Sequence, residues 1–206
     1  MNRSAKRVAI VALIIAASIL LGFAVDLIWT KLEQSSHPDR YMEYVSKYAY
    51  EYNVPEPVIL AVIKVESGFN PRAVSYDKDG EIIAMGLMQM VPKTFEWLCS
   101  DEHLDERLHE DDLFEPEISI KYGTYYLSYL HKKFDRNWDT ALAAYNGGEG
   151  NVAKWLKNPE YSDGNGNLTY IPFKETRNYV QKVNKAIDTY KNLYYQNQKE
   201  VVENEN

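Results

Sequence analysis

Apolar residues follow two different patterns along the chain. Val8 to Val25 is a run without a single charged side chain, whereas apolar positions beyond residue 39 recur every three or four residues between Pro and Gly. At a helical rise of about 1.5 Å per residue, the first run is close to the thickness of a bilayer core. The second pattern is typical of amphipathic helices. We therefore expect one N-terminal membrane helix followed by a helical domain.

The residues that flank the apolar run predict its orientation. Three basic residues precede it, Arg3, Lys6 and Arg7. Basic residues stay on the cytoplasmic side, and Trp29 suits the opposite interface. A cleaved signal peptide has a similar start, but this run is longer than usual and Gly22-Phe23-Ala24 is a poor cleavage site. We expect a single-pass anchor over residues 8–29 with residues 1–7 in the cytoplasm and the rest outside the cell membrane. Cleavage would instead yield a secreted protein.

Proline and glycine divide the remainder into short helices. The predicted helices cover residues 39–52, 55–67, a segment that begins at 92, 116–134, 138–146 and 175–196. Asp79-Gly80 followed by Glu81-Ile82-Ile83 predicts a hairpin within residues 76–85. Residues 161–167 read as a polar loop, and residues 168–171 as a second small strand. The prediction is a mainly α domain at 39–196 with a minor β element, a linker at 30–38 and a flexible tail at 197–206.

Composition and charge narrow the class of protein. Apolar residues at 45% and charged residues at 26% are ordinary for a globular chain. The formal net charge is −7, and the segment after the apolar run is still more acidic because three basic groups but only Asp26 lie before residue 30. Such a domain is a poor partner for nucleic acid. Cys99 is the only cysteine, which excludes an internal disulfide and a thiolate metal cluster.

One carboxylate is placed unusually for a soluble helix. In residues 55–67, Ile59, Val62 and Ile63 form an apolar face that Glu66 continues at three- and four-residue spacing. Burial raises the pKa of a carboxylic acid, as a general acid needs near neutral pH. The alternative is a Glu in a last helical turn that frays into solvent.

Further polar groups stand among apolar or helix-ending residues. Gln89 lies within the run Gly86 to Met90, and Tyr145 and Asn146 precede two glycines. Tyr179 comes one turn after Glu175. Each of these groups alone fits a structural role in capping or packing. Together they supply the acid, amides, hydroxyls and aromatic rings of a sugar-binding cleft.

Four motifs in order resemble the lytic transglycosylase family that shares the goose-type lysozyme fold. They are Glu66-Ser67-Gly68-Phe69-Asn70-Pro71, Gly86-Leu87-Met88-Gln89, Ala144-Tyr145-Asn146-Gly147-Gly148 and Glu175-Thr176-Arg177 with Tyr179-Val180. The resemblance covers about residues 40 to 190 and implies a lysozyme-like helical domain with Glu66 as catalytic acid. The substrate-binding residues that it implies are Ser67, Ser75, Gln89, Met90, Tyr145, Asn146, Glu175 and Tyr179.

The chain departs from the family pattern at two places. Residues 76–85 separate Ser75 from the Gly86 motif, where the family commonly has only a few residues, so we expect a reshaped groove wall and a displaced Ser75. Ser119 stands before Ile120, where the family usually has Asn. Neither departure removes the acid.

The resemblance implies a murein lyase. Its substrate would be peptidoglycan, cut at the β-1,4 bond between N-acetylmuramic acid and N-acetylglucosamine with formation of 1,6-anhydro-muramyl ends. Such a reaction requires neither cofactor nor metal. A hydrolytic muramidase, in which water replaces the sugar hydroxyl, is one alternative. A non-catalytic module that binds peptidoglycan as a scaffold is another.

Two acidic segments contain residue types that can bind metal ions. The stretch 101–112 around His103 and His109 matches no ligand spacing and reads as a solvated face. Asp163, Asn165 and Asn167 alternate as in a calcium loop, but Leu168 and Lys174 occupy its sixth and twelfth positions. We expect no metal site in either segment.

Overall fold

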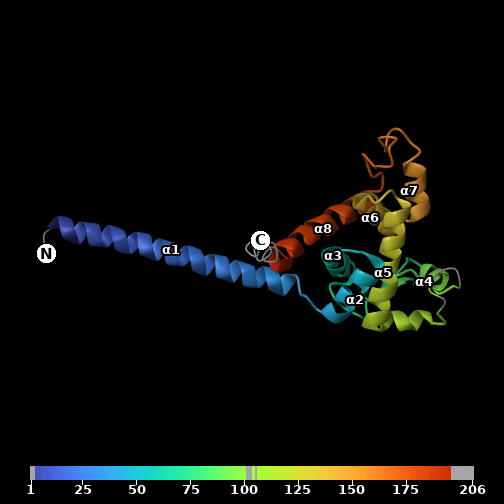
Figure 1. Cartoon of the computed structure of the whole chain (residues 1–206), viewed down its shortest axis with the longest axis horizontal. Helices are drawn as coiled ribbons and strands as arrows, with labels where there is room; N and C mark the ends of the chain where they lie inside the picture. Colours follow the sequence, from blue (N-terminus) through green and yellow to red (C-terminus); the bar gives the residue numbers. More distant parts are fainter. Residues whose placement is uncertain (1–2, 101–103, 105, 196–206) are drawn as a thin grey trace, which may run out of the picture. The chain divides into compact units, whose positions relative to one another are not determined.

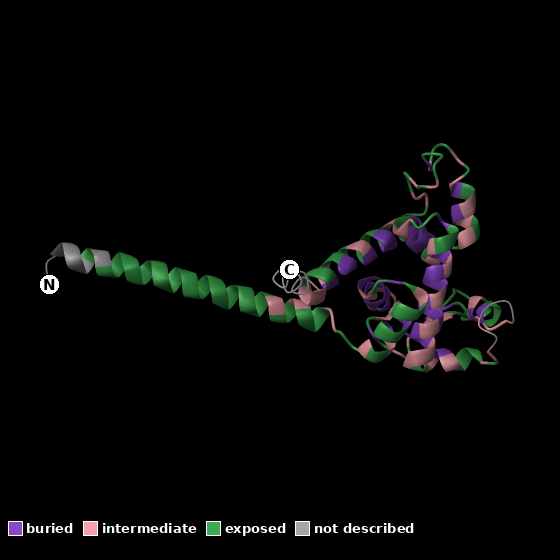
Figure 2. Ribbon diagram, in the orientation of Figure 1, coloured by how far each residue is buried: buried purple, intermediate pink, exposed green. Residues whose placement is uncertain are grey.

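The N-terminal unit is one long helix. The computed structural model describes residues 3–100, 104 and 106–195 and separates two units, Met1–Pro38 and Asp39–Asn206. Helix α1 (Arg3–Ser36) forms the first unit, and its described side chains are almost all exposed (Figure 2). By length and composition its segment Ala9–Ser36 can cross a membrane, and an 18-residue window within it has a mean hydropathy of 2.6. Residues 30–36, predicted as linker, continue the helix because no Gly or Pro interrupts them.

The second unit is mostly helical (Figure 1). Its elements are α2 (Met42–Tyr52), α3 (Glu56–Ser67), β1 (Val74–Tyr76), β2 (Ile82–Met85), α4 (Pro92–Leu98), the 3-10 turn η1 (Glu110–Phe114), α5 (Pro116–Lys133), α6 (Trp138–Gly147), α7 (Glu149–Trp155), α8 (Lys174–Tyr190) and the π-helical turn η2 (Lys191–Tyr195). The predicted class, mainly α with a small hairpin, is confirmed. The predicted tail at 197–206 and residues 101–103 and 105 of the acidic stretch lie outside the described residues.

Helix α3 is the centre of the core. Every residue from Pro57 to Ile63 is buried, and the helix packs against α8 and α2 (Figure 2). Its ends follow the sequence: Pro57 stands in the first turn, where its missing N–H is not needed, and Gly68 ends the helix at a φ of 59°. Helix α5 packs against both α2 and α6. This packing fixes the last turn of α3, with Glu66, inside the domain.

The two strands form an antiparallel hairpin. Val74 pairs with Met85 and Ser75 with Ala84, and a bulge between Ser75 and Tyr76 shifts the register. The Asp77 carboxylate accepts the N–H groups of Asp79 and Glu81 at 2.9 Å each, which closes the turn. The predicted hairpin is confirmed.

Several element predictions need correction. Helix α2 begins at Met42 rather than at residue 39 because Tyr41 adopts a left-handed backbone at φ 61°. Residues 168–171 form no strand, and the pairing there is one bridge between Ser162 and Leu168. Helix α8 ends at Tyr190, and the helical backbone continues as the π-helical turn η2 to Tyr195, so the predicted helix is confirmed up to the last described residue, with its final turns in π geometry. Helix α7 was not predicted, since Gly147 and Gly148 read as the end of a helix although the chain becomes helical again at once.

Candidate active site

Glu66 lies in the last turn of α3, at the edge of the buried core. The preceding residues on its face, Ile59, Val62 and Ile63, have no exposed surface, and Glu66 itself is only partly exposed. Burial strips hydration from the charged carboxylate and raises its pKa to about 7, from an ordinary value of 4.5. Glu66 is therefore largely protonated at slightly acidic pH, as a proton donor must be.

Two tyrosines from other helices surround this carboxyl group. The pKa values of Tyr145 on α6 and Tyr179 on α8 are raised well above the usual value, first by burial and then by the charge of Glu66. The Tyr179 hydroxyl in turn lowers the pKa of Glu66, against the larger effect of burial. Its geometry falls short of a hydrogen bond, and it has no hydrogen-bond partner among the described residues. It can therefore donate to a substrate oxygen or to the ionised carboxylate.

Among the described residues, no second carboxylate shifts the pKa of Glu66. Within the described part of the chain, its pKa responds only to burial and to Tyr179. Most glycosidases use two carboxyl groups, about 5 to 9.5 Å apart. The arrangement here is that of one acid among phenols.

The segment Gly86–Met90 lies beside these tyrosines. The Tyr145 hydroxyl donates to the carbonyl oxygen of Met88 at 2.7 Å and lies 3.6 Å from the Met90 sulfur. Ser67 donates to the carbonyl of Leu87 at 2.8 Å, which links the end of α3 to the same segment. Ser67 and Tyr145 thus use their hydroxyl protons within the protein and hold the segment against Glu66. Met90 is buried.

Gln89 joins this segment to the hairpin through side-chain hydrogen bonds. Its amide nitrogen donates to the carbonyl oxygens of Ala73 at 3.1 Å and Gly86 at 2.9 Å, and its amide oxygen accepts from the Ser75 hydroxyl at 2.7 Å. Ser75 is therefore in direct contact with Gln89, although the insertion led us to expect its displacement. Because the inserted residues fold back as a hairpin, Ser75 and Ala84 stay paired at its base.

Asn146 and Glu175 form a separate, exposed group. Together with Gly147, Phe173, Lys174 and Thr176 they line a cavity of about 410 Å³ between the end of α6 and the start of α8. Asn146 directly follows Tyr145, and Glu175 precedes Tyr179 by one helical turn. Two of the eight residues expected to bind substrate, Tyr145 and Tyr179, act on Glu66. Four others belong to the segment Gly86–Met90 or are joined to it by hydrogen bonds: Ser67, Ser75, Gln89 and Met90. Asn146 and Glu175 line the cavity of about 410 Å³ instead.

Gly86 and Ser119 were named from the sequence, but Gly123 and the way in which these small residues support the site were missed. The buried Ser119 hydroxyl on α5 accepts the N–H of Met88 at 3.2 Å. Gly86 has a φ of 79°, and a Cβ there would overlap the Leu113 carbonyl oxygen and lie 2.8 Å from the Ser119 hydroxyl. At Gly123, one turn after Ser119, a Cβ would overlap Met88. The pair of small residues four positions apart on one helix face was the available signal.

Comparison with known proteins agrees with this geometry. The family model described as "Transglycosylase SLT domain" matches residues 43–167. The soluble lytic murein transglycosylase of Salmonella typhimurium is 34% identical over 164 residues, which are 79% of this chain and 24% of the relative. The membrane-bound lytic murein transglycosylase C of Glaesserella parasuis is 30% identical over 174 residues, which are 75% of this chain and 46% of the relative.

Solved structures show the same likeness. The 70 kDa soluble lytic transglycosylase of Escherichia coli aligns with a TM-score of 0.69 at 30% identity, over 79% of this chain and 26% of that chain. An inactive mutant of the lytic transglycosylase Slt from Pseudomonas aeruginosa aligns with a TM-score of 0.64 at 30% identity, over 76% and 24%. This chain spans about a quarter of the length of the soluble relatives and under half of the membrane-bound one.

Proposed function

Because the chain belongs to the transglycosylase SLT family, we propose that it is a lytic murein transglycosylase that cuts peptidoglycan between N-acetylmuramic acid and N-acetylglucosamine. The feature that carries this proposal is a carboxyl group with a pKa of about 7 beside the buried Tyr179 and the half-buried Tyr145, with no second carboxylate among the described residues shifting its pKa. One group must then serve as both acid and base. A reaction that returns the proton to the same carboxylate suits such a site.

The proposed reaction runs in two proton transfers. Glu66 first gives its proton to the glycosidic oxygen, and N-acetylglucosamine leaves. The electron-poor C1 of muramic acid is stabilised by the acetamido group of the substrate or by the Tyr145 and Tyr179 dipoles. The ionised Glu66 then takes the proton of the C6 hydroxyl, whose oxygen attacks C1 and closes a 1,6-anhydro ring. Attack within one molecule has a large advantage over attack by water.

The proposed substrate contacts follow from which hydrogen-bonding groups each side chain already uses within the protein. Tyr179 has a buried hydroxyl that acts on Glu66, so we propose that it meets the sugar only at the carboxyl group, where the scissile bond would lie. Asn146 and Glu175 face the open cavity of about 410 Å³ and would hold the adjoining saccharide. Ser67, Ser75 and Gln89 spend their hydrogen bonds within the protein, so we assign them mainly to positioning the groove wall, together with Met90.

We also propose that α1 anchors the enzyme in a bacterial cell membrane. In this organisation residues 1–7 lie in the cytoplasm, residues 8–29 cross the bilayer and residues 39–196 form the catalytic domain outside. The support is the apolar segment Ala9–Ser36, the basic residues before it and a relative named membrane-bound. An acidic domain has no electrostatic attraction to an anionic wall, so retention near the substrate would depend on the anchor.

Digestion of purified cell walls tests the activity. The full chain should release muropeptides that end in 1,6-anhydro-muramic acid, identified by mass spectrometry as one water lighter than the hydrolysed product. Glu66→Gln should lower the rate by about 10² to 10⁴, the usual contribution of a general acid, without loss of the folded state. Products with reducing muramic acid ends would identify a hydrolytic muramidase. Binding without any product would identify a non-catalytic module.

A further inference from the structure

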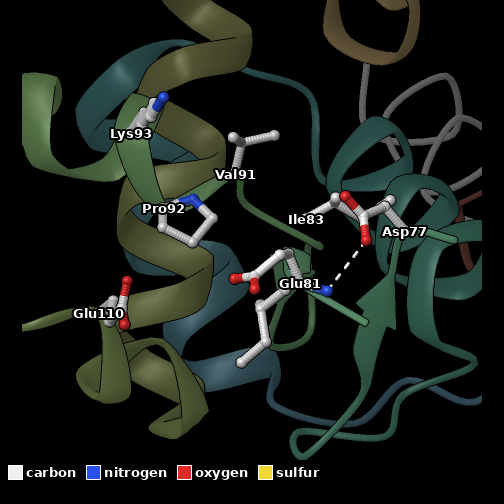
Figure 3. Close-up of a pocket in the computed structure, with 8 residues that line it drawn as sticks. Asp77, Glu81, Ile83, Val91, Pro92, Lys93 and Glu110 are labelled. Atoms are coloured by element: carbon white, nitrogen blue, oxygen red, sulfur yellow. Dashed lines mark hydrogen bonds between the residues drawn. The ribbon is translucent and has the colours of Figure 1, made fainter. Parts of the chain in front are cut away.

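An exposed apolar surface surrounds a cavity between the hairpin and α4. The cavity measures about 650 Å³ and is lined by the hairpin, by Val91 to Lys93 at the start of α4, and by Glu110 of η1 (Figure 3). Of its apolar lining residues, Ile82 is 43%, Ile83 45% and Val91 47% exposed. The helical core does not need these side chains. Contiguous exposed apolar groups of this kind mark interaction surfaces.

Two carboxylates of this cavity have no side-chain partner among the described residues. The third, Asp77, is occupied by the two N–H groups of the hairpin turn. Glu81 and Glu110 make no side-chain hydrogen bond or ion pair with any described residue, and in Figure 3 the Glu81 carboxyl group points toward the side on which Glu110 lies. Lys93, the one cation of the lining, pairs with neither of them among the described groups. The cavity therefore offers an apolar surface with excess negative charge.

The cavity adjoins the candidate active site. Val91 directly follows Met90, whose sulfur contacts the Tyr145 hydroxyl, and Ser75 at the hairpin base is bonded to Gln89. The backbone of Met85, which ends β2, exchanges two hydrogen bonds of 3.0 Å with Met90. A ligand in the cavity would lie against Val91 and Pro92, which directly follow the segment Gly86–Met90 in the chain.

We propose that this cavity binds the peptide stem of the glycan substrate. The aliphatic chain of a diamino acid residue lies on Ile82, Ile83 and Val91, and its amine lies between Glu81 and Glu110. The proposal rests on the proposed function, because peptidoglycan supplies such an amine on a side branch of muramic acid. A cation with an apolar stem matches the lining in both charge and surface. The hairpin insertion would then select stem-bearing strands.

Three substrates separate charge from shape. The full chain is incubated separately with three substrates. They are glycan strands with intact peptide stems, the same strands with acetylated stem amines, and strands from which an amidase has removed the stems. Initial rates of 1,6-anhydro end formation are compared. We expect intact strands to react about fivefold faster than either of the others, as for one partly exposed ion pair. Equal rates on intact and acetylated strands would overturn the proposal.

Charge-neutral variants test the two carboxylates. Glu81→Gln and Glu110→Gln should each lower the preference for intact strands about twofold, and the double variant should remove it, since each replaces one partly exposed charge partner. Rates on stem-free strands should not change. Glu160→Gln is the matched control, because Glu160 is also exposed and lines none of the cavities described here. A double variant with the preference of the unaltered protein would contradict the assignment.

A binding measurement tests the stem site independently of the proposed lyase activity. Isolated stem peptide is titrated into the Glu66→Gln full chain, and the shifts of Ile methyl signals are followed by NMR. Saturable shifts at Ile82 and Ile83 that the double variant and acetylated peptide lack would support the site. Failure of every substrate to give anhydro ends would refute the proposed function, while absence of these shifts would refute the stem site.

Discussion

The pKa of Glu66 depends on its position in the last turn of α3, where the helix leaves the buried core. One turn earlier the position would be fully buried, like Ile63, and after Gly68 the chain turns away at a left-handed residue. At position 66 the carboxyl group loses enough hydration to hold a proton near pH 7 but remains partly accessible. A solvent-exposed Glu at a frayed helix end, the alternative that the sequence left open, does not fit this burial.

Burial of Glu66, opposed in part by Tyr179, sets the upper pH limit of the proposed reaction. The rate should fall about tenfold per pH unit above pH 7, because only the protonated Glu66 donates. Tyr179→Phe removes the group that lowers the pKa of Glu66, so this alkaline limb should move to higher pH. Initial rates between pH 5 and 9 measure it. Tyr52→Phe removes another buried, unpartnered hydroxyl that does not act on Glu66 and should leave the limb in place. An unchanged limb in Tyr179→Phe would contradict the assigned contact.

The same shift makes stability depend on pH. Folding raises the pKa of Glu66 from 4.5 to about 7, so the folded protein binds this proton more tightly than the unfolded chain does. That stabilisation is complete below pH 4.5 and is lost as the pH rises through 7. Relative to the unaltered protein, Glu66→Gln should gain up to about 3 kcal/mol in unfolding free energy between pH 4.5 and pH 8. Denaturant unfolding at the two pH values measures the gain, and a difference independent of pH would contradict the shift.

Helix α5 supports the site through its small residues rather than through contacts with substrate. Ser119 and Gly123 let the segment Gly86–Met90 approach the helix closely, and Gly86 itself fits under the Leu113 carbonyl. The family pattern has Asn where this chain has Ser119. The structure shows that a serine hydroxyl suffices to accept the N–H of Met88.

Two glycines give opposite predictions. Gly86→Ala should cost about 2 to 4 kcal/mol in unfolding free energy, because its Cβ meets backbone atoms and its φ is 79°. Gly150→Ala, where no atom lies within 4 Å of the added Cβ, should gain about 0.5 to 1 kcal/mol within helix α7. Thermal and denaturant unfolding compare the two variants. Equal effects would show that the close approach at Gly86 carries no energetic weight.

The helical unit, Asp39–Asn206, carries its own core. All buried apolar residues of the described chain lie between Val45 and Tyr190, and the first unit, Met1–Pro38, contributes none of them. Folding of the helical unit therefore does not require α1. The long apolar helix has a separate role, which we assign to the membrane.

Removal of residues 1–38 should separate the two roles. The shortened protein should unfold at the same temperature as the full chain and cut soluble glycan strands at the same rate. The full chain should sediment with membranes and resist extraction by salt, whereas the shortened protein should stay in the supernatant. The intact mass of the sedimented chain shows whether the anchor is retained. A full chain found in the supernatant with a shortened N-terminus would indicate cleavage.

Local patterns sufficed for most elements of the helical unit. Proline at the start of α3, α4 and α5, and Gly68 after α3, act through their own backbone limits, so they can be read without a partner. The dipeptide Asp79-Gly80, which is typical of tight turns, likewise allowed the hairpin to be predicted. Helix α7 escaped prediction because Gly148 serves two helices at once, as the end of α6 and the start of α7.

The sequence by itself determined the membrane-length helix, the mainly helical class and the acid at position 66, because helical spacing, chain breakers and an ordered set of motifs are local properties. Only the tertiary structure decided what surrounds that acid. The bonding of Ser75 to Gln89, the enclosure of Glu66 by Tyr145 and Tyr179, and the cavity between the hairpin and α4 join residues far apart in the chain. These contacts form only when the chain packs, so the spacing of residues along the sequence does not reveal them.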